Sequence, residues 1–236
     1  WLGGEFAAIA AAWARPVQWA SWTVSAPLLE IRAAVAVVEC VHVAIINGDD
    51  EALIAGDAAG CAAVVARIGA ARCLQLDYPL AVHVPELRTV ADAWLDLHRC
   101  DTHPAHCGRI YSTASGAAYA PGREACARAI LEQADRCLDL RPLIRQAWDD
   151  GVRVFIEHGP GGGFARVIRG ILGEREALVV SFDRRGQGVE ATLSALTRRR
   201  ASSRTARRSF SSGSANSSNA RQHRSSAARR VCTLSI

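Results

Sequence analysis

Residues 154–172, VFIEHGPGGGFARVIRGIL, combine β-prone residues, a glycine-rich turn and an amphipathic helical pattern. A strand, a glycine turn and a helix N-terminus bind phosphate in many proteins, because the backbone N–H groups and the helix dipole favour an anion. A Walker loop also needs a lysine, and this chain has none. Gly159, Gly161, Gly162 and Gly163 do not give the GxGxxG spacing of a dinucleotide loop. We therefore favour a tight turn, which could still line a site, over a nucleotide site.

The segment CDTHPAHC offers Cys100, His103, His106 and Cys107 as zinc ligands, since zinc takes thiolate and imidazole ligands in a tetrahedron. The spacing is not that of a known finger, and Pro104 interrupts it. We interpret the segment as a polar surface loop and expect no metal.

His83 lies between the apolar residues 80–82 and Pro85, where a strand would end and a helix would begin. Catalytic groups often lie at such ends. Taken alone, however, a histidine after an apolar run is more often a hydrogen-bonded core residue.

The elements around His83 predict a small β-turn-β-α-β unit at residues 41–82. Its parts are a strand at 41–47, a turn at 48–50, a strand at 51–56, a helix from Asp57 through Ile68 and an extended segment at 72–82. The preceding residues 15–34 are ambiguous, with Trp19 and Trp22 expected in the core and a helix possible from residue 26.

The rest of the chain alternates helices and strands, which predicts an α/β fold. The expected helices cover residues 84–98, 123–134, 140–151, 162–172 and 188–197, and the expected strands 109–116, 152–157 and 177–182. Residues 1–14 read as a turn and an alanine-rich helix.

Charge is distributed unevenly along the chain. Ten of the 28 arginines fall at or after Arg198, so residues 1–196 carry 18 arginines against 23 acidic residues, a net charge of −5. This mildly acidic part does not support nucleic-acid binding. Residues 197–236 are arginine, serine and alanine with few large apolar residues, and we expect them to be disordered, either as a basic tail or as the product of a shifted reading frame.

Eight scattered cysteines without a CxxC pair favour reduced thiols and a cytoplasmic location. No apolar run is long enough for a membrane span, so we expect no membrane partner.

Four stretches, in order, resemble acyl-CoA:acyl-carrier-protein transacylases, most closely the acyltransferase domains of polyunsaturated fatty acid and polyketide synthases. VHVAIINGDDEALIAGD resembles their VxxAxxNxPxxVVxSGD hairpin, and YPLAVHVPEL resembles the FHSPLM segment that carries their catalytic histidine. RIYSTASG resembles FYSTVTG, and DGVRVFIEHGPGGG resembles FVExGPGxxL. The N-terminal LGGEFAAIAAAWA is similar to the segment that follows their nucleophile elbow, GHSLGE.

The resemblance implies an α/β-hydrolase-like large subdomain, truncated here, and a small ferredoxin-like subdomain near residues 41–82, together forming a domain at 1–196. It implies ping-pong transfer of an acyl group from acyl-CoA to the phosphopantetheine thiol of an acyl carrier protein, without a bound cofactor. His83 would be the catalytic base. Gly159, Pro160 and Gly161 would border the acyl site, and other synthase domains would be partners.

The chain departs from the family in two places. No GxSxG is present, so the nucleophile cannot be named, and Ser112 and Ser115 have no catalytic role in the resemblance. The region that carries the carboxylate-binding arginine of malonyl-type relatives is shortened or absent, and Arg32 fits that role poorly. We therefore expect a C-terminal fragment, inactive alone. The alternatives are a non-catalytic docking domain of a synthase and an RNA-binding protein that uses the basic tail.

Overall fold

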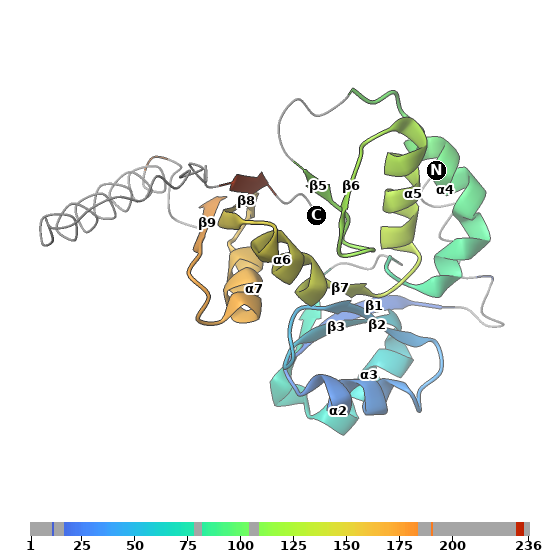
Figure 1. The fold of residues 1–236 in the computed structure, drawn as a ribbon. Helices are drawn as coiled ribbons and strands as arrows, with labels where there is room; N and C mark the ends of the chain where they lie inside the picture. The colour runs from blue at the N-terminus through green and yellow to red at the C-terminus, as the bar shows by residue number, and fades with distance from the viewer. Residues whose placement is uncertain are drawn as a thin grey trace, which may run out of the picture. The chain divides into compact units, whose positions relative to one another are not determined.

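The computed structural model describes residues 17–77, 82–103, 109–183 and 230–233, together with the single residues 11 and 190 (Figure 1). The chain divides into two compact units, one formed by Trp1–Asp150 with Gly170–Gly173 and the other by Gly151–Arg169 with the residues from Glu174 to Ser235. The helices expected at residues 1–14 and 188–197 lie almost entirely outside the described residues.

The first unit is built on a five-stranded sheet of order β4-β1-β3-β2-β7. In chain order its elements are β1 (Trp19–Val24), α2 (Leu28–Val35), β2 (Val41–Ile46), β3 (Ala52–Asp57), α3 (Ala58–Ile68), η1 (Ala70–Arg72), β4 (Cys73–Leu76) and, later, β7 (Leu138–Asp139). Strands β1 to β4 pair antiparallel, whereas β7 lies parallel to β2. The sequence pattern does not predict strand β1, although Trp19 and Trp22, the tryptophans expected in the core, both lie in it.

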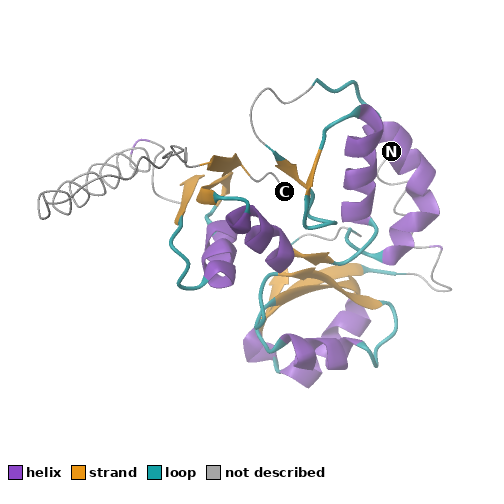
Figure 2. Cartoon of the chain, in the orientation of Figure 1, coloured by secondary structure: helices purple, strands orange, loops and turns teal. Residues whose placement is uncertain are grey.

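Both faces of the central strands of this sheet pack against other elements, which explains why these strands are rich in apolar residues on both sides, whereas the edge strand β4 leaves Leu74 exposed. On one face, residues of β1 and β3 such as Val24 and Ile54 pack with Ile31 of α2 and Val64 of α3. The opposite face packs against the segment that follows residue 81, in a cluster of Ala44, Ala55, Val84, Leu87 and Ala134. Within this unit, Figure 2 shows α2 and α3 on one side of the sheet and the helices at Ala91–His98 and Arg123–Ala134 on the other.

The segment after residue 81 forms the 3₁₀-helix η2 (Pro85–Val90) and α4 (Ala91–His98), where the sequence pattern predicts one continuous helix. The short hairpin β5 (Ile110–Tyr111) and β6 (Ala118–Tyr119) follows, then α5 (Arg123–Ala134) and α6 (Leu140–Asp149). Asp139 caps α6, because its side chain accepts a hydrogen bond from the backbone N–H of Arg141 at 3.0 Å.

The second unit contains a parallel sheet of order β10-β8-β9, formed by β8 (Val152–Pro160), β9 (Leu178–Asp183) and β10 (Arg230–Thr233). Helix α7 (Gly163–Leu172) connects β8 to β9. Strand β10 is a difference from expectation, because residues 230–233 fall in the segment predicted to be disordered. The short β-prone run of Val231, Cys232 and Thr233 in an otherwise Arg/Ser/Ala-rich tail is consistent with a strand there.

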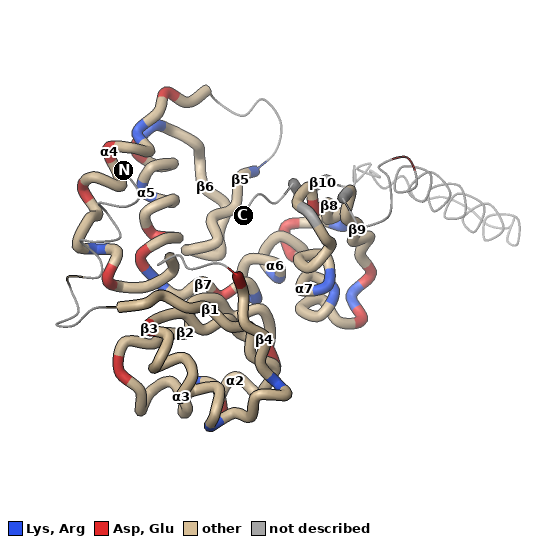
Figure 3. The backbone as a smooth tube through the Cα atoms, turned by 180° about the vertical axis from the view of Figure 1, so that it is seen from behind, with Lys and Arg blue, Asp and Glu red and all other residues tan. Residues whose placement is uncertain are grey.

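Acidic and basic residues are interspersed along the described helices and turns (Figure 3). No helix in the described part of the chain is both long and apolar enough to cross a membrane.

Candidate functional site

His83 lies at the start of the turn that leads into η2, and its backbone adopts a φ of +64°. Residues other than glycine occupy this left-handed region rarely and at a cost, so the surroundings must enforce the conformation. The turn falls where the sequence pattern predicts the end of a strand and the start of a helix.

The C-terminus of α5 enforces that conformation. The backbone N–H groups of His83 and Val84 both donate to the carbonyl oxygen of Ala134, at 2.7 and 3.2 Å. The imidazole Nδ1 of His83 lies 2.7 Å from the carbonyl oxygen of Gln133. The last carbonyl groups of a helix have no partner within the helix, so α5 offers acceptors that this turn satisfies.

These contacts fix the tautomer of His83. A carbonyl oxygen only accepts hydrogen bonds, so Nδ1 must carry the proton, and Nε2 of the neutral ring then carries the lone pair. Burial lowers the pKa of His83 from its ordinary value of 6.5, and the hydrogen bond to Gln133 opposes this shift only in part. The result is a neutral imidazole at neutral pH, with one nitrogen held by the helix and the other able to accept a proton.

Several contacts hold the turn against the sheet and α5. Val84 and Leu87 are fully buried in the second core cluster. Glu86 lies 2.7 Å from Nε2 of His42 on β2. Arg88 donates from Nε to the buried carboxylate of Asp135 at 3.1 Å. The position of His83 therefore depends on η2, β2 and the C-terminus of α5 together.

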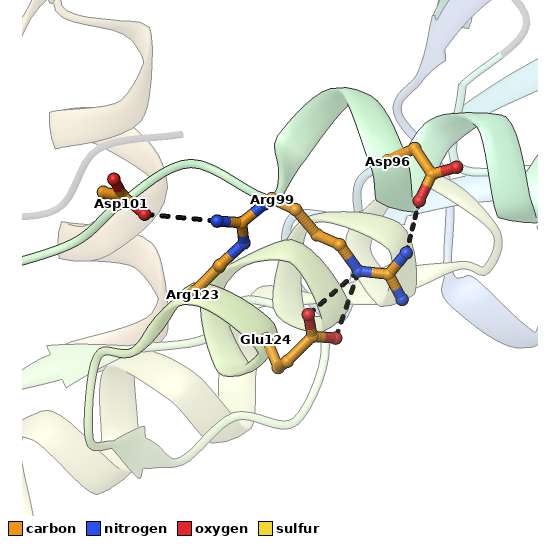
Figure 4. A network of polar contacts seen from close by, with 5 residues as sticks. All are labelled: Asp96, Arg99, Asp101, Arg123 and Glu124. Carbon is orange, nitrogen blue, oxygen red and sulfur yellow. Dashed lines mark hydrogen bonds and ion pairs between the residues drawn. The ribbon is translucent and has the colours of Figure 1, made fainter.

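The N-terminal end of α5 is tied to the end of α4 by an exposed network of charged residues (Figure 4). Arg99 donates from Nε to both carboxylate oxygens of Glu124, at 2.9 and 3.2 Å, and also pairs with Asp96. Arg123 donates to Asp101 at 3.2 Å. Exposed pairs of this kind stabilise little individually, so the network orients the helix ends more than it stabilises the fold.

The glycine turn at residues 159–163 leads from β8 to α7, and a φ of +95° at Gly161 and +80° at Gly162 gives a physical reason for glycine at those two positions. Glu157, buried three residues before the end of β8, accepts hydrogen bonds from the backbone N–H groups of Phe164 and Ala165, at 3.1 and 3.0 Å. The first turn of α7 thus already has an anion from its own chain. This observation supports the interpretation as a structural turn over a phosphate site.

His83 and the glycine turn belong to different units, so the roles that the resemblance implies for His83 and for Gly159, Pro160 and Gly161 at one acyl site stay predictions. The N-terminal residues 1–4, which by the resemblance follow the place of the nucleophile elbow, lie outside the described residues.

Other residues singled out from the sequence have structural surroundings. The hydroxyl of the buried Ser112 accepts from the backbone N–H groups of Ala114 and Ser115, which stabilises the turn after β5. Arg32 is exposed on α2. Cys100 and His103 are described but His106 and Cys107 are not, and within the described ranges no group of three His, Cys, Asp or Glu side chains could hold a metal.

Sequence reasoning did not identify Gln133, Ala134, Asp135 or Glu157. The first two act through backbone carbonyl groups, which leave no trace in residue type. Glu157 had a usable signal, because a carboxylate placed shortly before a helix N-terminus is a common way to satisfy its free N–H groups.

Comparison with solved structures identifies the fold. The acyltransferase domain from the second module of the salinomycin polyketide synthase is 26% identical over 78% of this chain, with a TM-score of 0.64. A malonyl-CoA:acyl carrier protein transacylase from Xanthomonas oryzae is 19% identical over 76% of the chain, also with a TM-score of 0.64. The malonyl-transacylase solved in complex with a type II polyketide synthase acyl carrier protein is 15% identical over 80%, with a TM-score of 0.66.

The match covers 44%, 58% and 62% of those three structures, so this chain spans roughly half of each. No protein-family model and no curated protein matches the sequence. The chain has the mixed α/β fold of these acyltransferase domains, as the ordered sequence motifs predict.

Proposed function

We propose that this protein takes part in acyl transfer from acyl-CoA to the phosphopantetheine thiol of an acyl carrier protein, with His83 as the general base. The fold shared with acyltransferase domains gives the class of reaction. The observation that carries the proposal is the state of His83, a partly buried, neutral imidazole whose Nδ1 donates to the carbonyl oxygen of Gln133.

This arrangement suits a general base. In a Ser-His pair the histidine needs a partner that fixes its tautomer and orientation, and here a backbone carbonyl replaces the carboxylate of a catalytic triad. Nε2 would take the proton of a serine as it attacks the thioester and return it to the departing CoA thiolate. In the second half of the reaction it would take the proton of the carrier-protein thiol as the sulfur attacks the acyl-serine ester, and return it to the departing serine oxygen.

The acyl-accepting serine has no candidate among the 236 residues, because the sequence contains no GxSxG. Ser112 is buried and engaged with its own turn, which supports leaving it out. We therefore propose that the 236 residues alone do not form an acyl-enzyme. The glycine turn would border the acyl site through its backbone, as in the family resemblance.

The subdomain assignment follows from topology. Residues 19–76 have the order β-α-β-β-α-β, and their strands lie in the order β4-β1-β3-β2, an arrangement that supports a ferredoxin-like subdomain starting earlier than residue 41. The parallel strands β8 and β9 with α7 would belong to the α/β-hydrolase-like subdomain. An acyl carrier protein and other synthase domains would be the partners. The six cysteines of the described residues 17–77, 82–103 and 109–183 are free thiols, which supports a cytoplasmic location.

The decisive experiment is a transfer assay on the full gene product, with labelled malonyl-CoA and acetyl-CoA as donors and a phosphopantetheinylated carrier protein as acceptor. We expect labelled carrier protein, and a loss of at least about 100-fold in kcat/KM for His83→Gln, which removes the base. The control is His98→Gln, a change of a histidine on α4 whose ring contacts the carbonyl of Trp94. No transfer by the full gene product, or equal transfer by His83→Gln, would contradict the proposal.

A second candidate is a non-catalytic synthase domain, which the missing GxSxG favours. The two functions differ in one measurement. If the full gene product binds a carrier protein but forms no acyl-enzyme by intact-mass spectrometry, the docking function is supported instead.

A further inference from the structure

The turn that carries His83 is joined to the C-terminus of α5 by a side-chain pair as well as by backbone contacts. Arg88 of η2 donates from Nε to Oδ2 of Asp135, at 3.1 Å. Asp135 directly follows Ala134, whose carbonyl oxygen accepts from His83 and Val84, and lies two residues after Gln133. The pair therefore spans the same two segments as the hydrogen bonds of His83.

Asp135 is an unfavourable residue at its position unless cations accompany it. It caps the C-terminal end of α5, where the helix dipole repels negative charge, and only 6% of its surface is exposed. A buried carboxylate must be paired and hydrogen-bonded. Arg88 binds one of its oxygens, and Arg136 binds the other from Nε at 2.9 Å.

The two arginines differ in what they connect. Arg136 is the next residue along the chain from Asp135, so its contact is local. Arg88 lies 47 residues earlier and five residues after His83, so its contact fixes the distance between the η2 turn and the end of α5. That distance also determines whether Nδ1 of His83 reaches the Gln133 carbonyl.

We propose that Arg88 and Asp135 are positioning residues that hold the imidazole of His83 on the carbonyl oxygen of Gln133. The catalytic purpose of holding the imidazole rests on the proposed function, whereas the geometry that holds it does not. Arg88 and Asp135 act through the backbone of η2 and the α5 terminus. Without the pair, the η2 turn keeps its apolar anchors Val84 and Leu87, and the ring of His83 loses its single orientation.

The test is NMR of the ring nitrogens in the 236-residue chain labelled with ¹⁵N-histidine, with the His83 signals assigned by their loss in His83→Gln. In the unmodified chain we expect one neutral tautomer, protonated at Nδ1. In Arg88→Gln we expect its Nδ1 proton to exchange with water about fivefold faster, and an Nε2-protonated form to become detectable, because a partly exposed pair contributes up to about that factor.

Arg136→Gln is the matched control, since it removes an arginine from the same carboxylate without affecting the link to η2. We expect less than a twofold change in exchange there, and a partial return to normal in Arg88→Lys. Melting temperatures and amide spectra identify any variant that is unfolded, and Asp135→Asn then provides a second test of the same link. Equal effects of Arg88→Gln and Arg136→Gln, or none in either, would overturn the proposal.

The NMR result and the result of the acyl-transfer assay can be distinguished. An unaffected ring with active transfer removes the positioning role and leaves the function. A disturbed ring in a protein without transfer activity leaves the positioning role and removes the function.

Discussion

At the scale of single residues, His83 shows how a partly buried histidine can stay neutral and oriented without a carboxylate hydrogen-bonded to its ring. The desolvation that lowers its pKa is opposed by one backbone hydrogen bond, which holds the tautomer but adds no full charge. A carboxylate partner in place of Gln133 would have favoured the imidazolium. The arrangement keeps Nε2 unprotonated at neutral pH.

This environment predicts a pH dependence of stability. Because the pKa of His83 is lower in the folded chain than its unfolded value near 6.5, the unfolded state binds the proton more readily as the pH falls below about 6.5. The contribution of the neutral His83 ring to the free energy of unfolding is therefore complete above about pH 6.5, and it is lost as the pH falls towards the pKa of the folded state. Urea denaturation from pH 7.5 to 5 should show a shallower decrease in free energy of unfolding for His83→Gln than for the unmodified chain. Parallel curves for the two proteins would show that the ring titrates normally.

Glu157 illustrates a second residue-scale effect, the use of an internal anion at a helix N-terminus. Glu157→Ala leaves the N–H groups of Phe164 and Ala165 without their carboxylate acceptor, so we expect it to lower the free energy of unfolding by about 1–2 kcal/mol. Glu157→Gln retains an acceptor and should cost about half of that. Glu174→Gln, at an exposed position after α7, is the control and should change stability by less than about 0.5 kcal/mol. Chemical denaturation measures all three, and similar losses for Glu157→Ala and Glu174→Gln would refute the capping role.

At the scale of elements, the C-terminus of α5 organises the site by offering its unpaired carbonyl groups to a turn that is about 50 residues away in sequence. The sequence pattern predicts α5 at 123–134, the same residues as observed, because a helix of this length is a local property. Its role could not be predicted, since any residue type presents the same carbonyl. The start of a helix shortly after His83 was predictable for the opposite reason, since Pro85 marks the first residue of η2 locally. The strand predicted through residue 82 is observed only as β4, which ends at Leu76, and residues 78–81 lie outside the described part of the chain.

The segment before β2 passes so close to strand β3 that we expect a side chain at Gly56 to destabilise the fold. The carbonyl oxygen of Cys40 accepts from the N–H of Asp57 at 2.8 Å, and a Cβ added to Gly56 would lie only 2.1 Å from that oxygen. Gly56→Ala must push the two segments apart, and we expect a loss of about 3 kcal/mol in the free energy of unfolding. Gly48→Ala, in the turn after β2 with no atom within 4 Å of an added Cβ, should be nearly neutral. Thermal melts of both variants test this, and a neutral Gly56→Ala would mean that the strands can move apart freely.

At the scale of the whole molecule, the sequence predicts an element well when the residues that determine it are close together in the chain. The strands at 41–47, 51–56, 152–157 and 177–182 were predicted within a few residues, because alternating or β-branched runs between glycine and aspartate turns act over short distances. Strand β1 was missed, since WASWTV has no strict alternation and is recognised only through its pairing with β3 and β4. The ring geometry of His83 likewise depends on contacts between segments that are distant in sequence.

Strand β10 leads to the last prediction, on the second unit as a whole. The sequence predicts that residues 197–236 are disordered, and a disordered tail would contribute nothing to stability, yet residues 230–233 pair with β8 in parallel. We therefore expect the four residues of β10 to contribute to stability. Deleting residues 230–236 uncovers the β8 edge and should lower the melting temperature by about 3–6 °C. A shift of this size corresponds to about 1–2 kcal/mol in a domain of this length. Val231→Pro, which removes one backbone N–H from β10, should reproduce much of this decrease in the otherwise intact chain.

Hydrogen exchange should localise the change to the amides of β8, because parallel pairing is the contact that is lost. If both variants melt with the unmodified chain and the β8 amides exchange at unchanged rates, the β10 pairing contributes nothing, and the whole of residues 197–236 behaves as the composition predicts.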